Sequence, residues 1–241
     1  MVWWQIIIIC IASYFMGNIS VSRMIAKTQK KDITKLGSGN AGSTNILRNF
    51  GFGMGVFNLI LDILKGFIPA IFFYKIFGDN LAYLYIAGIS VVVGHIYPVI
   101  FKFKGGKGIA SMLGVFLAAD PFVTLIVIGI AAVTWLIFKY GSIASFVCVT
   151  GLTVYEGIMI QEMGHPQVKL ICFLLFAIFC FTWYAHRSNI ERLLCGRENK
   201  VDLIKSTKKK LKMEKKLNNM PVAVEPQVQE DDKQVQGQGG Q

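Results

Sequence analysis

Charged residues are scarce in this chain. Asp, Glu, Lys and Arg make up 16% of its 241 residues, whereas 54% are hydrophobic and the mean hydropathy is +0.52. Soluble domains carry about 25% charged residues, so the composition excludes an ordinary soluble protein. The charges also fall in short basic clusters between long apolar runs. This distribution predicts a multi-spanning membrane protein with no separate soluble domain.

Metal-binding and disulfide chemistry lack the residues that they need. The three histidines are widely separated, at His95, His165 and His186, and the five cysteines form no CxxC pair. Most of those cysteines lie within apolar runs, where the side chain acts as a small apolar group. We therefore expect neither a metal site nor a disulfide framework from these residues. The formal net charge of +11 comes without a nucleic-acid-binding motif, so we assign it to membrane orientation and anionic ligands.

The apolar runs predict an all-α polytopic membrane protein. A membrane-spanning helix needs about 20 apolar residues. Runs of about that length cover residues 2–22, 50–77, 81–101, 121–138, 142–161 and 168–185. The first run has no basic leader and no clear cleavage site, so we expect it to be retained.

A shorter apolar run, 108–119, leaves the number of spans open. Twelve helical residues cover about 18 Å, less than the hydrocarbon core of about 30 Å. Asp120 and Pro121 then break the run. We expect about seven transmembrane helices, or five if residues 108–138 form a re-entrant segment.

Basic residues predict the orientation of the bundle. They concentrate in residues 23–48, in 102–107 and from Arg187 onward, whereas the opposite loops hold little beyond Lys75 and Lys169. Lys and Arg favour cytoplasmic loops. We therefore expect the N-terminus outside, the C-terminus in the cytoplasm and all three basic regions on the cytoplasmic side.

The chain divides into two parts by composition. Residues 1–204 contain every apolar run and predict a single membrane-embedded domain. Residues 205–241 are rich first in lysine and then in glutamine and glycine. Segments of that kind bury too little apolar surface to fold alone, so we expect a disordered cytoplasmic tail.

The first polar cluster, residues 37–48 (GSGNAGSTNILR), has the composition of an anion-binding loop. It contains a literal GxGxxG, but no strand or βαβ unit surrounds it, which excludes a dinucleotide-binding site. Glycines let backbone N–H groups approach an oxyanion, and a helix that begins near Ser43 adds its positive end. Arg48 can then bind a phosphate with two hydrogen bonds. The alternative is a flexible loop with an ordinary helix cap at Ser43 or Thr44.

Polar positions continue from this cluster into the second apolar run. Near-helical spacing places several of them on one face of a continuous helix: Asn45, Arg48, Gly55, Asp62 and Gly66. On such a helix Asp62 lies about 21 Å beyond Arg48, with Lys65 as its i+3 neighbour. Ionisable residues within a membrane are functional candidates, but a structural ion pair is equally consistent with this spacing.

The second cluster, residues 94–108 (GHIYPVIFKFKGGKG), is not a Walker P-loop, because position 101 is Phe and position 108 is Gly. Three lysines around a Gly-Gly pair, ahead of an apolar helix, still predict an anion cradle. Positive-inside charge alone would explain Lys102, but not the GGKG sequence. His95 is either a functional residue or an ordinary histidine at a helix end.

The third cluster, residues 186–198 (HRSNIERLLCGRE), closes the last apolar run on the same side. Alone it would be an ordinary basic membrane anchor. A carboxylate among these cations can orient a lysine or hold a substrate hydroxyl. Together the three clusters predict a place where a phosphate-bearing polar substrate meets a lipidic one. No GxSxG, Ser-His-Asp or Cys-His set is evident, which favours direct acyl transfer without a covalent intermediate.

The sequences of these clusters resemble the motifs of a known enzyme family. GSGNAGSTNILR, GHIYPVIFKFKGGKGIAS and NIERLLCGRENK are similar to the three signature motifs of the acyl-phosphate-dependent glycerol-3-phosphate acyltransferases, the PlsY family, and LDILKG of the second run also matches. The resemblance covers about residues 1–204. Two departures are mild: Ser43 stands where Ala is usual, and Asn199 follows Glu198 in a variable stretch.

The resemblance implies a reaction and a location. The reaction is transfer of a fatty acyl group from acyl phosphate to the 1-hydroxyl of glycerol 3-phosphate, which gives lysophosphatidic acid and phosphate in bacterial phospholipid biosynthesis. The enzyme would be an all-helical, multi-pass protein of the bacterial cell membrane, with a cytoplasmic active site and no metal or cofactor. We expect it to act as a monomer in the lipid bilayer, without a nucleic-acid partner.

The resemblance also implies roles for individual residues. The catalytic candidates are Ser38, His95, Lys104, Asn189 and Glu198. The candidates for binding substrate and phosphate are Gly37, Gly39, Asn40, Gly42, Thr44, Asn45, Arg48, Gly105, Gly106, Lys107 and Gly108. The general base is either His95 or the substrate's own phosphate. Two other classes remain as alternatives: a membrane transporter of a phosphorylated solute and a structural protein that binds anionic lipid.

Overall fold

The computed structural model describes residues 2–200, and the expected disordered tail, 205–241, lies outside the described residues. The described part is helical, without a β-strand. Its α-helices are α1 (Trp3–Asn18), α2 (Val21–Thr28), α3 (Ser43–Phe50), α4 (Phe52–Ile76), α5 (Leu81–Ile96), α6 (Ile109–Ala119), α7 (Pro121–Phe138), α8 (Gly141–Glu162), α9 (Val168–Ala185) and α10 (Arg187–Leu194). Two 3₁₀ turns, η1 (Ile33–Lys35) and η2 (Val99–Phe101), complete it.

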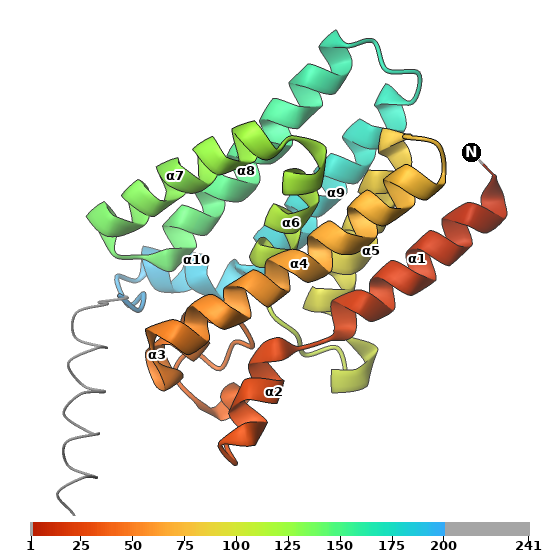
Figure 1. Ribbon diagram of the computed structural model, residues 1–241. Coiled ribbons are helices and arrows are strands. Elements are labelled where there is room, and N and C mark those ends of the chain that lie inside the picture. Colours follow the sequence, from red (N-terminus) through yellow and green to blue (C-terminus); the bar gives the residue numbers. More distant parts are fainter. Residues whose placement is uncertain (1, 201–241) are drawn as a thin grey trace, which may run out of the picture.

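The long helices run side by side between two ends of the molecule (Figure 1). The chain starts at one end, where Trp4 packs edge-on against Phe77 at the close of α4. Helices α2, α3 and α10 gather at the other end, which we call the site end. The start of α1 and the helix α10 therefore lie at opposite ends of the bundle, as the expected topology requires.

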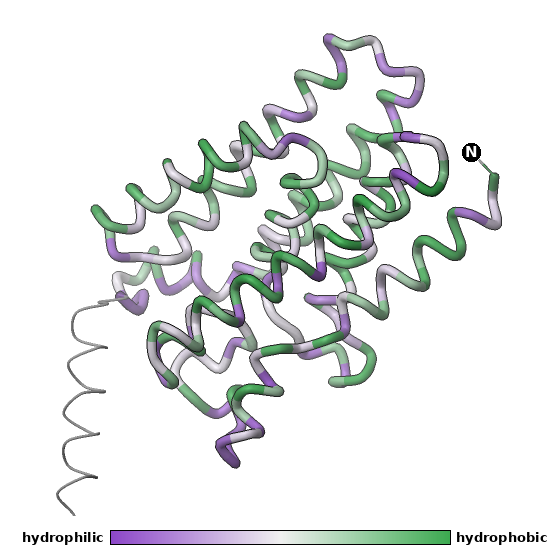
Figure 2. Tube along the Cα trace, in the orientation of Figure 1, coloured by the Kyte–Doolittle hydropathy of each residue, from purple (hydrophilic) through white to green (hydrophobic). Residues whose placement is uncertain are grey.

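Six helical segments have the length and hydropathy of a membrane span within the described residues. They contain α1, α4, α5, α7, α8 and α9. Hydrophobic residues cover most of these helices, and hydrophilic ones concentrate near α2, α10 and the connections (Figure 2). The predicted all-α polytopic fold is confirmed, with about six candidate spans; the seventh predicted segment is α6, whose 11 residues cover only about 16 Å.

The α6–α7 pair is a helical hairpin with its turn at Asp120. The Asp120 carboxylate accepts a hydrogen bond of 3.0 Å from the Val123 amide, and Pro121 occupies the first turn of α7. Asp caps free amides, and Pro has no N–H to lose at this position, so the sequence both ends α6 and starts α7 here. Both Gly108 and Gly141 line one cavity. The pair therefore leaves the site end and returns to it.

The expectation of one continuous helix from Asn45 to Gly66 is wrong. The chain breaks at Gly51, which has φ +91°, a conformation that a side chain disfavours. The short helix α3 then packs against α4, where Gly55 leaves room for Leu47. As a result Arg48 and Asp62 line the same cavity instead of lying 21 Å apart along one axis.

Helix α6 is held against α4 by close backbone contact. A Cβ at Gly66 of α4 would overlap the Ser111 carbonyl oxygen, and one at Gly114 of α6 would overlap the Ile63 carbonyl oxygen. In membranes, small residues at helix interfaces let backbones approach and maximise packing contacts. This contact fixes the start of α6 at the site end.

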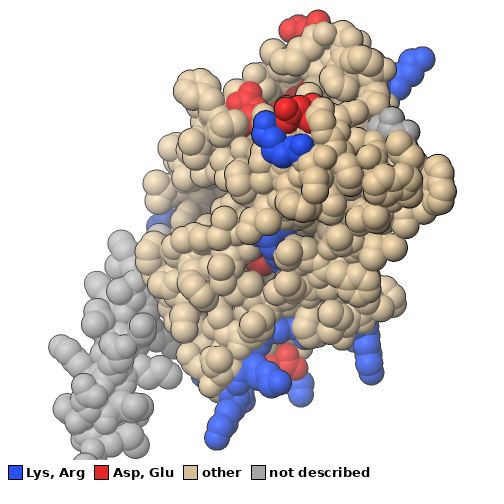
Figure 3. Space-filling model, turned by 45° about the vertical axis from the view of Figure 1, so that its right-hand side comes forward, with Lys and Arg blue, Asp and Glu red and all other residues tan. Residues whose placement is uncertain are grey.

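Charged side chains on the surface lie mainly at the two ends of the bundle. Figure 3 shows Lys and Arg side chains gathered at the lower end of the molecule, beneath a mostly uncharged surface. The exposed ion pair of Lys75 with Asp79, at 2.9 Å, lies at the far end of α4. The basic residues of the predicted cytoplasmic loops thus share the site end with α2, α3 and α10.

Candidate active site

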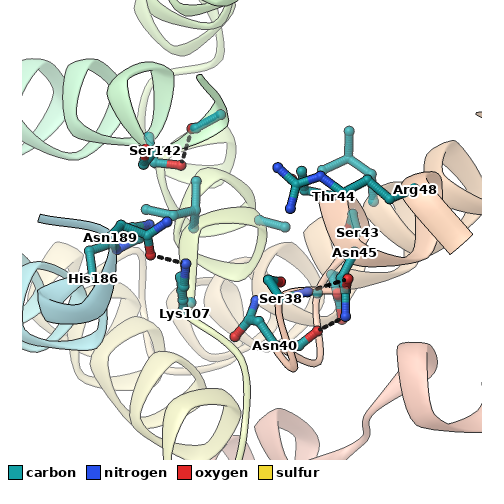
Figure 4. Close-up of a pocket in the computed structure, with 18 of the residues that line it drawn as sticks. Ser38, Asn40, Ser43, Thr44, Asn45, Arg48, Lys107, Ser142, His186 and Asn189 are labelled. Atoms are coloured by element: carbon teal, nitrogen blue, oxygen red, sulfur yellow. Dashed lines mark hydrogen bonds between the residues drawn. The ribbon is translucent and has the colours of Figure 1, made fainter. Parts of the chain in front are cut away.

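The three polar clusters of the sequence meet in one cavity at the site end (Figure 4). Arg48 and Lys107 point into it between the glycine-rich loop on one side and Asn189, His186 and Ser142 on the other. The residues that line it are Ser38, Asn40, Gly42, Ser43, Thr44, Asn45, Arg48, Leu59, Asp62, His95, Lys107, Gly108, Ile109, Ala110, Gly141, Ser142, Ser145, His186, Asn189, Arg192 and Glu198. We call it the main cavity.

Three helices start at the wall of the main cavity. Their first residues are Ser43 of α3, Ile109 of α6 and Gly141 of α8. The first amides of a helix have no partner within it, and the helix dipole places partial positive charge there. Three such ends at one cavity form a strong site for an anion.

Asn45 holds the glycine-rich loop in shape. Its side chain is almost fully buried, and its Oδ1 accepts a hydrogen bond of 3.1 Å from the Ser38 amide. Its Nδ2 donates to the carbonyl oxygens of Leu36 at 2.9 Å and Asn40 at 3.0 Å. These bonds use both ends of the amide, so Asn45 fixes the shape of the loop that lines the cavity.

Arg48 is the cation of the first cluster. One terminal nitrogen donates a hydrogen bond of 2.9 Å to the Asn199 carbonyl oxygen, while the buried Nε has no partner within residues 2–200. Burial lowers the pKa of Arg48, although the nearby Glu198 carboxylate partly offsets this. The guanidinium stays charged and keeps free N–H groups for an anion.

Lys107, Asn189 and Glu198 form a hydrogen-bonded chain. Lys107 Nζ donates to Asn189 Oδ1, and Asn189 Nδ2 donates to Glu198 Oε1 at 2.7 Å. Glu198 also accepts hydrogen bonds from Ser142 Oγ at 3.2 Å and Arg192 Nε at 2.9 Å. The carboxylate therefore positions three polar side chains from α8 and α10 around the lysine.

The Lys107 ammonium sits in an unfavourable environment. Burial lowers the pKa of Lys107 to about 8, and repulsion from Arg192 and Arg48 adds to this effect. Attraction to Glu198 opposes it only in part. A phosphate placed beside the ammonium would restore its preference for the charged form.

His186 is a site residue that sequence reasoning did not select. Its Nδ1 lies 2.8 Å from the Thr182 carbonyl oxygen, so the ring donates there and keeps Nε2 as an acceptor. Burial and the neighbouring Lys107 lower the pKa of His186 to about 4, which keeps the ring neutral at pH 7. The residue is 2% exposed and lines the main cavity.

The GGKG segment packs directly on the end of α5. Gly105 and Gly106 donate hydrogen bonds of 3.1 Å to the carbonyl oxygens of Ile96 and His95. A Cβ at Gly106 would overlap His95 Nε2. Only glycine fits between these atoms. Gly105 and Gly106 therefore let the loop pack closely on the end of α5, which brings Lys107 over the cavity.

His95 lies at the floor of the main cavity. It is 8% exposed, and its Nδ1 lies 3.4 Å from Ser111 Oγ and 4.0 Å from Asp62 Oδ1. Lys65 Nζ lies 2.7 Å from the same Asp62 oxygen and donates a hydrogen bond of 2.8 Å to the Ile19 carbonyl oxygen. The floor thus contains a buried ion pair beside the histidine.

Lys104 lies outside the main cavity. It is exposed and borders a second, adjoining cavity of about 340 Å³, which shares Ser38, Asn40, Lys107 and Arg192 with the main one. The second cavity also contains Gly39, Gly105 and Gly106, whereas Gly37 lies on neither wall. Gly42, Thr44 and Gly108 lie on the main wall.

Several main-cavity residues carry no sequence signal of their own. Ser142 and Ser145 belong to the first turns of an apolar helix, and Arg192 belongs to a cluster that could have been a membrane anchor. Only the packing of α8 and α10 brings them to the cavity. Within the described residues, no group of three His, Cys, Asp or Glu side chains could hold a metal ion.

Comparison with known proteins agrees with this geometry. A family model described as glycerol-3-phosphate acyltransferase matches residues 7–196. The chain belongs to the glycerol-3-phosphate acyltransferase family. The resemblance inferred from the three motifs is thereby confirmed. The two alternative functions, a transporter and a lipid-binding structural protein, are set aside in favour of an acyltransferase.

The chain aligns with nearly the whole length of two named relatives. The glycerol-3-phosphate acyltransferase of Aquifex aeolicus is 40% identical over 191 residues, which is 79% of this chain and 96% of that protein. The glycerol-3-phosphate acyltransferase of Finegoldia magna is 41% identical over 197 residues, which is 81% of this chain and 96% of that protein.

Two crystal structures of PlsY (YgiH), described as an integral membrane glycerol 3-phosphate acyltransferase, share the fold. The glycerol 3-phosphate form has 38% sequence identity and a TM-score of 0.73, and it covers 83% of this chain and 97% of that one. The lysophosphatidic acid form has a TM-score of 0.71 at the same identity, and it covers 84% and 98% of the two chains. The chain is therefore an all-helical integral membrane protein of this family.

Proposed function

We propose that the chain transfers a fatty acyl group from acyl phosphate to the 1-hydroxyl of glycerol 3-phosphate, releasing lysophosphatidic acid and phosphate. The observation that carries the proposal is the main cavity, where three cations and three helix starts face one space. Leu59 and Ile109 add an apolar wall to it. A cavity of this composition suits a phosphomonoester that must meet an acyl chain from the bilayer.

Phosphate binding falls to Arg48, Lys107 and the amides at the starts of α3 and α6. Ser38 lies on both cavities, and its hydroxyl makes no hydrogen bond to another described residue. It is therefore free to donate to a substrate oxygen. Lys104, from the second cavity, acts at the approach to the site rather than on the reacting atoms.

Stabilisation of the reacting oxygens falls to the Lys107–Asn189–Glu198 chain. In direct transfer the acceptor hydroxyl attacks the acyl carbonyl, and negative charge develops on the carbonyl oxygen and then on the departing phosphate. A lysine fixed by hydrogen bonds stabilises such charge without reorganisation. Glu198 holds Asn189, Ser142 and Arg192, so its role is to keep that lysine in place.

Three groups are candidates for contact with the acceptor hydroxyl or its proton. His95 at the cavity floor and the substrate's own phosphate remain the alternatives from the sequence. The geometry adds His186, whose neutral ring presents Nε2 as an acceptor. We assign His186 the orientation of the acceptor hydroxyl, since a group with a pKa of about 4 accepts a hydrogen bond but is a weak base.

We place the active site at the cytoplasmic face of a bacterial cell membrane, in a monomer. The support is the asymmetry of charge: the site end contains the basic loops, and the start of α1 lies at the opposite end. The main cavity draws on residues 38–198, in line with one membrane-embedded domain.

A comparison of donors tests the proposal. Purified protein in detergent is given glycerol 3-phosphate with either acyl phosphate or acyl-CoA, and lysophosphatidic acid is measured. We expect product from acyl phosphate alone, and a loss of at least tenfold in kcat/KM with Lys107→Ala. Product from acyl-CoA at an equal rate would refute the donor assignment. Lys102→Ala, on the outer part of the same loop, is the matched control.

A further inference from the structure

A buried hydrogen-bonded chain runs from the end of α1 to the wall of the main cavity. Asn58 of α4 is fully buried, and its Nδ2 lies 2.8 Å from Asp62 Oδ2 and 2.7 Å from Ser43 Oγ. Asp62 is paired with Lys65, whose ammonium donates to the Ile19 carbonyl oxygen. The chain ends at Ser43, the first residue of α3 and part of the cavity wall.

The chemistry of this chain fixes the direction of each hydrogen bond. An ionised carboxylate only accepts, so Asp62 requires the amide nitrogen of Asn58 to face it. The same nitrogen carries a second N–H, which then donates to Ser43 Oγ. The serine oxygen is thus used as an acceptor, and its own O–H proton remains available. The Ser43 hydroxyl makes no other hydrogen bond to the residues that the structure describes.

We propose that Ser43 is an additional phosphate-binding residue, and that Asn58 and Asp62 are positioning residues that hold it as a hydrogen-bond donor to substrate. The assignment rests on the proposed use of the main cavity for phosphate. Its ligand is a phosphate oxygen of glycerol 3-phosphate or of acyl phosphate, next to the first amides of α3. The Ser43 hydroxyl is half-buried at the cavity wall, where an unused donor favours an acceptor on a bound substrate. Substrate supplies the acceptor that the last member lacks.

The structural alternative is that these hydrogen bonds only hold α3 against α4. In that case removal of Ser43 Oγ would change thermal stability and leave the Michaelis constants unaltered. A phosphate-binding serine instead raises the KM of the substrate that it contacts. Measuring KM after removal of the Ser43 hydroxyl therefore distinguishes the two roles.

The test compares Ser43→Ala, Ser43→Thr, Asn58→Leu and the double variant with the wild type. Transfer is measured at varied glycerol 3-phosphate with saturating acyl phosphate, and then with the roles exchanged. We expect Ser43→Ala to raise the KM of one substrate about 10- to 100-fold, as for a lost hydrogen bond to a charged group. The substrate affected identifies the phosphate. Ser43→Thr, which keeps the hydroxyl, should restore at least half of the lost affinity.

Asn58→Leu tests the positioning step. It keeps the side-chain size but removes the donor, so we expect a rise in the same KM and no further rise in the double variant. Unfolding in detergent is followed for every variant, and Ser43→Ala keeps the test decisive if Asn58→Leu fails to fold. Unchanged KM values in Ser43→Ala beside an active wild type would overturn the role of Ser43. A wild type without transfer from acyl phosphate would instead refute the proposed function.

Discussion

The low pKa of Lys107 predicts how substrate affinity depends on pH. With a pKa of about 8, the ammonium is about 90% protonated at pH 7 and about 10% protonated at pH 9. A lysine with its ordinary pKa would remain charged over this whole range. Because the pKa is lowered, the cation is present below pH 8 and is lost as pH rises through that value. Affinity for a phosphate dianion should fall with it.

The expected size of the effect follows from those populations. If only the charged form binds phosphate, the KM for glycerol 3-phosphate rises about tenfold between pH 7 and pH 9. The assay is initial-rate transfer at saturating acyl phosphate across pH 6.5–9.5, roughly the range around this pKa. Rates are corrected at each pH for spontaneous hydrolysis of the donor.

Lys107→Arg is the matched control for this prediction. A guanidinium stays charged across the range, so its KM should lose the rise above pH 8 even if its kcat is low. The explanation fails if the wild-type KM is flat to pH 9.5. It also fails if Lys107→Arg shows the same rise, because another group would then be titrating.

Three further changes test the structure around this lysine. Glu198→Gln keeps the shape but removes the charge that holds Asn189 and Arg192, so kcat/KM should fall by roughly 10- to 100-fold without loss of folding. Gly106→Ala forces a Cβ into His95, so it should cost about 1–3 kcal/mol of stability and most activity, while Gly157→Ala in open space should cost neither. Asp120→Ala removes the cap of α7 and should lower stability by about 1 kcal/mol with kcat unchanged. Unfolding in detergent and initial rates measure all three, and a reversed order between Gly106→Ala and Gly157→Ala would contradict the packing argument.

The long helices were predictable because hydrophobicity alone determines them. The run 168–185 coincides with α9, and the break at Asp120 appears where capping chemistry requires it. The meeting of the three clusters was predictable too. Basic loops that share a side of the membrane must share an end of the bundle, whatever the path of the segment between them.

The break between α3 and α4 was not predictable from periodicity. Gly51 lies where a glycine is tolerated within a helix, and only its positive φ shows that the chain turns there. That turn brings Asp62 to the same cavity as Arg48. A pattern of polar residues at helical spacing therefore described two helices as one.

The choice between Lys104 and Lys107 depended on the backbone as well. The two lysines lie three residues apart in one loop, and sequence reasoning gave the catalytic role to the first. Lys102 and Phe103 both have positive φ, which turns the loop before Gly105 and Gly106 pack on α5. Lys104 is left on the outer cavity, and Lys107 is carried over the main one.

The charges of the main cavity explain why its cations cost stability before substrate arrives. Arg48, Lys107 and Arg192 face it together with three positive helix starts, whereas Glu198 is the main carboxylate that opposes them. Asp62, the other acid of the wall, is already paired with a lysine below the floor. Burial lowers the pKa values of Arg48 and Lys107, and repulsion from the neighbouring cations adds to this effect. A phosphate dianion removes this repulsion, so the same arrangement that weakens the empty protein provides the affinity for its substrates.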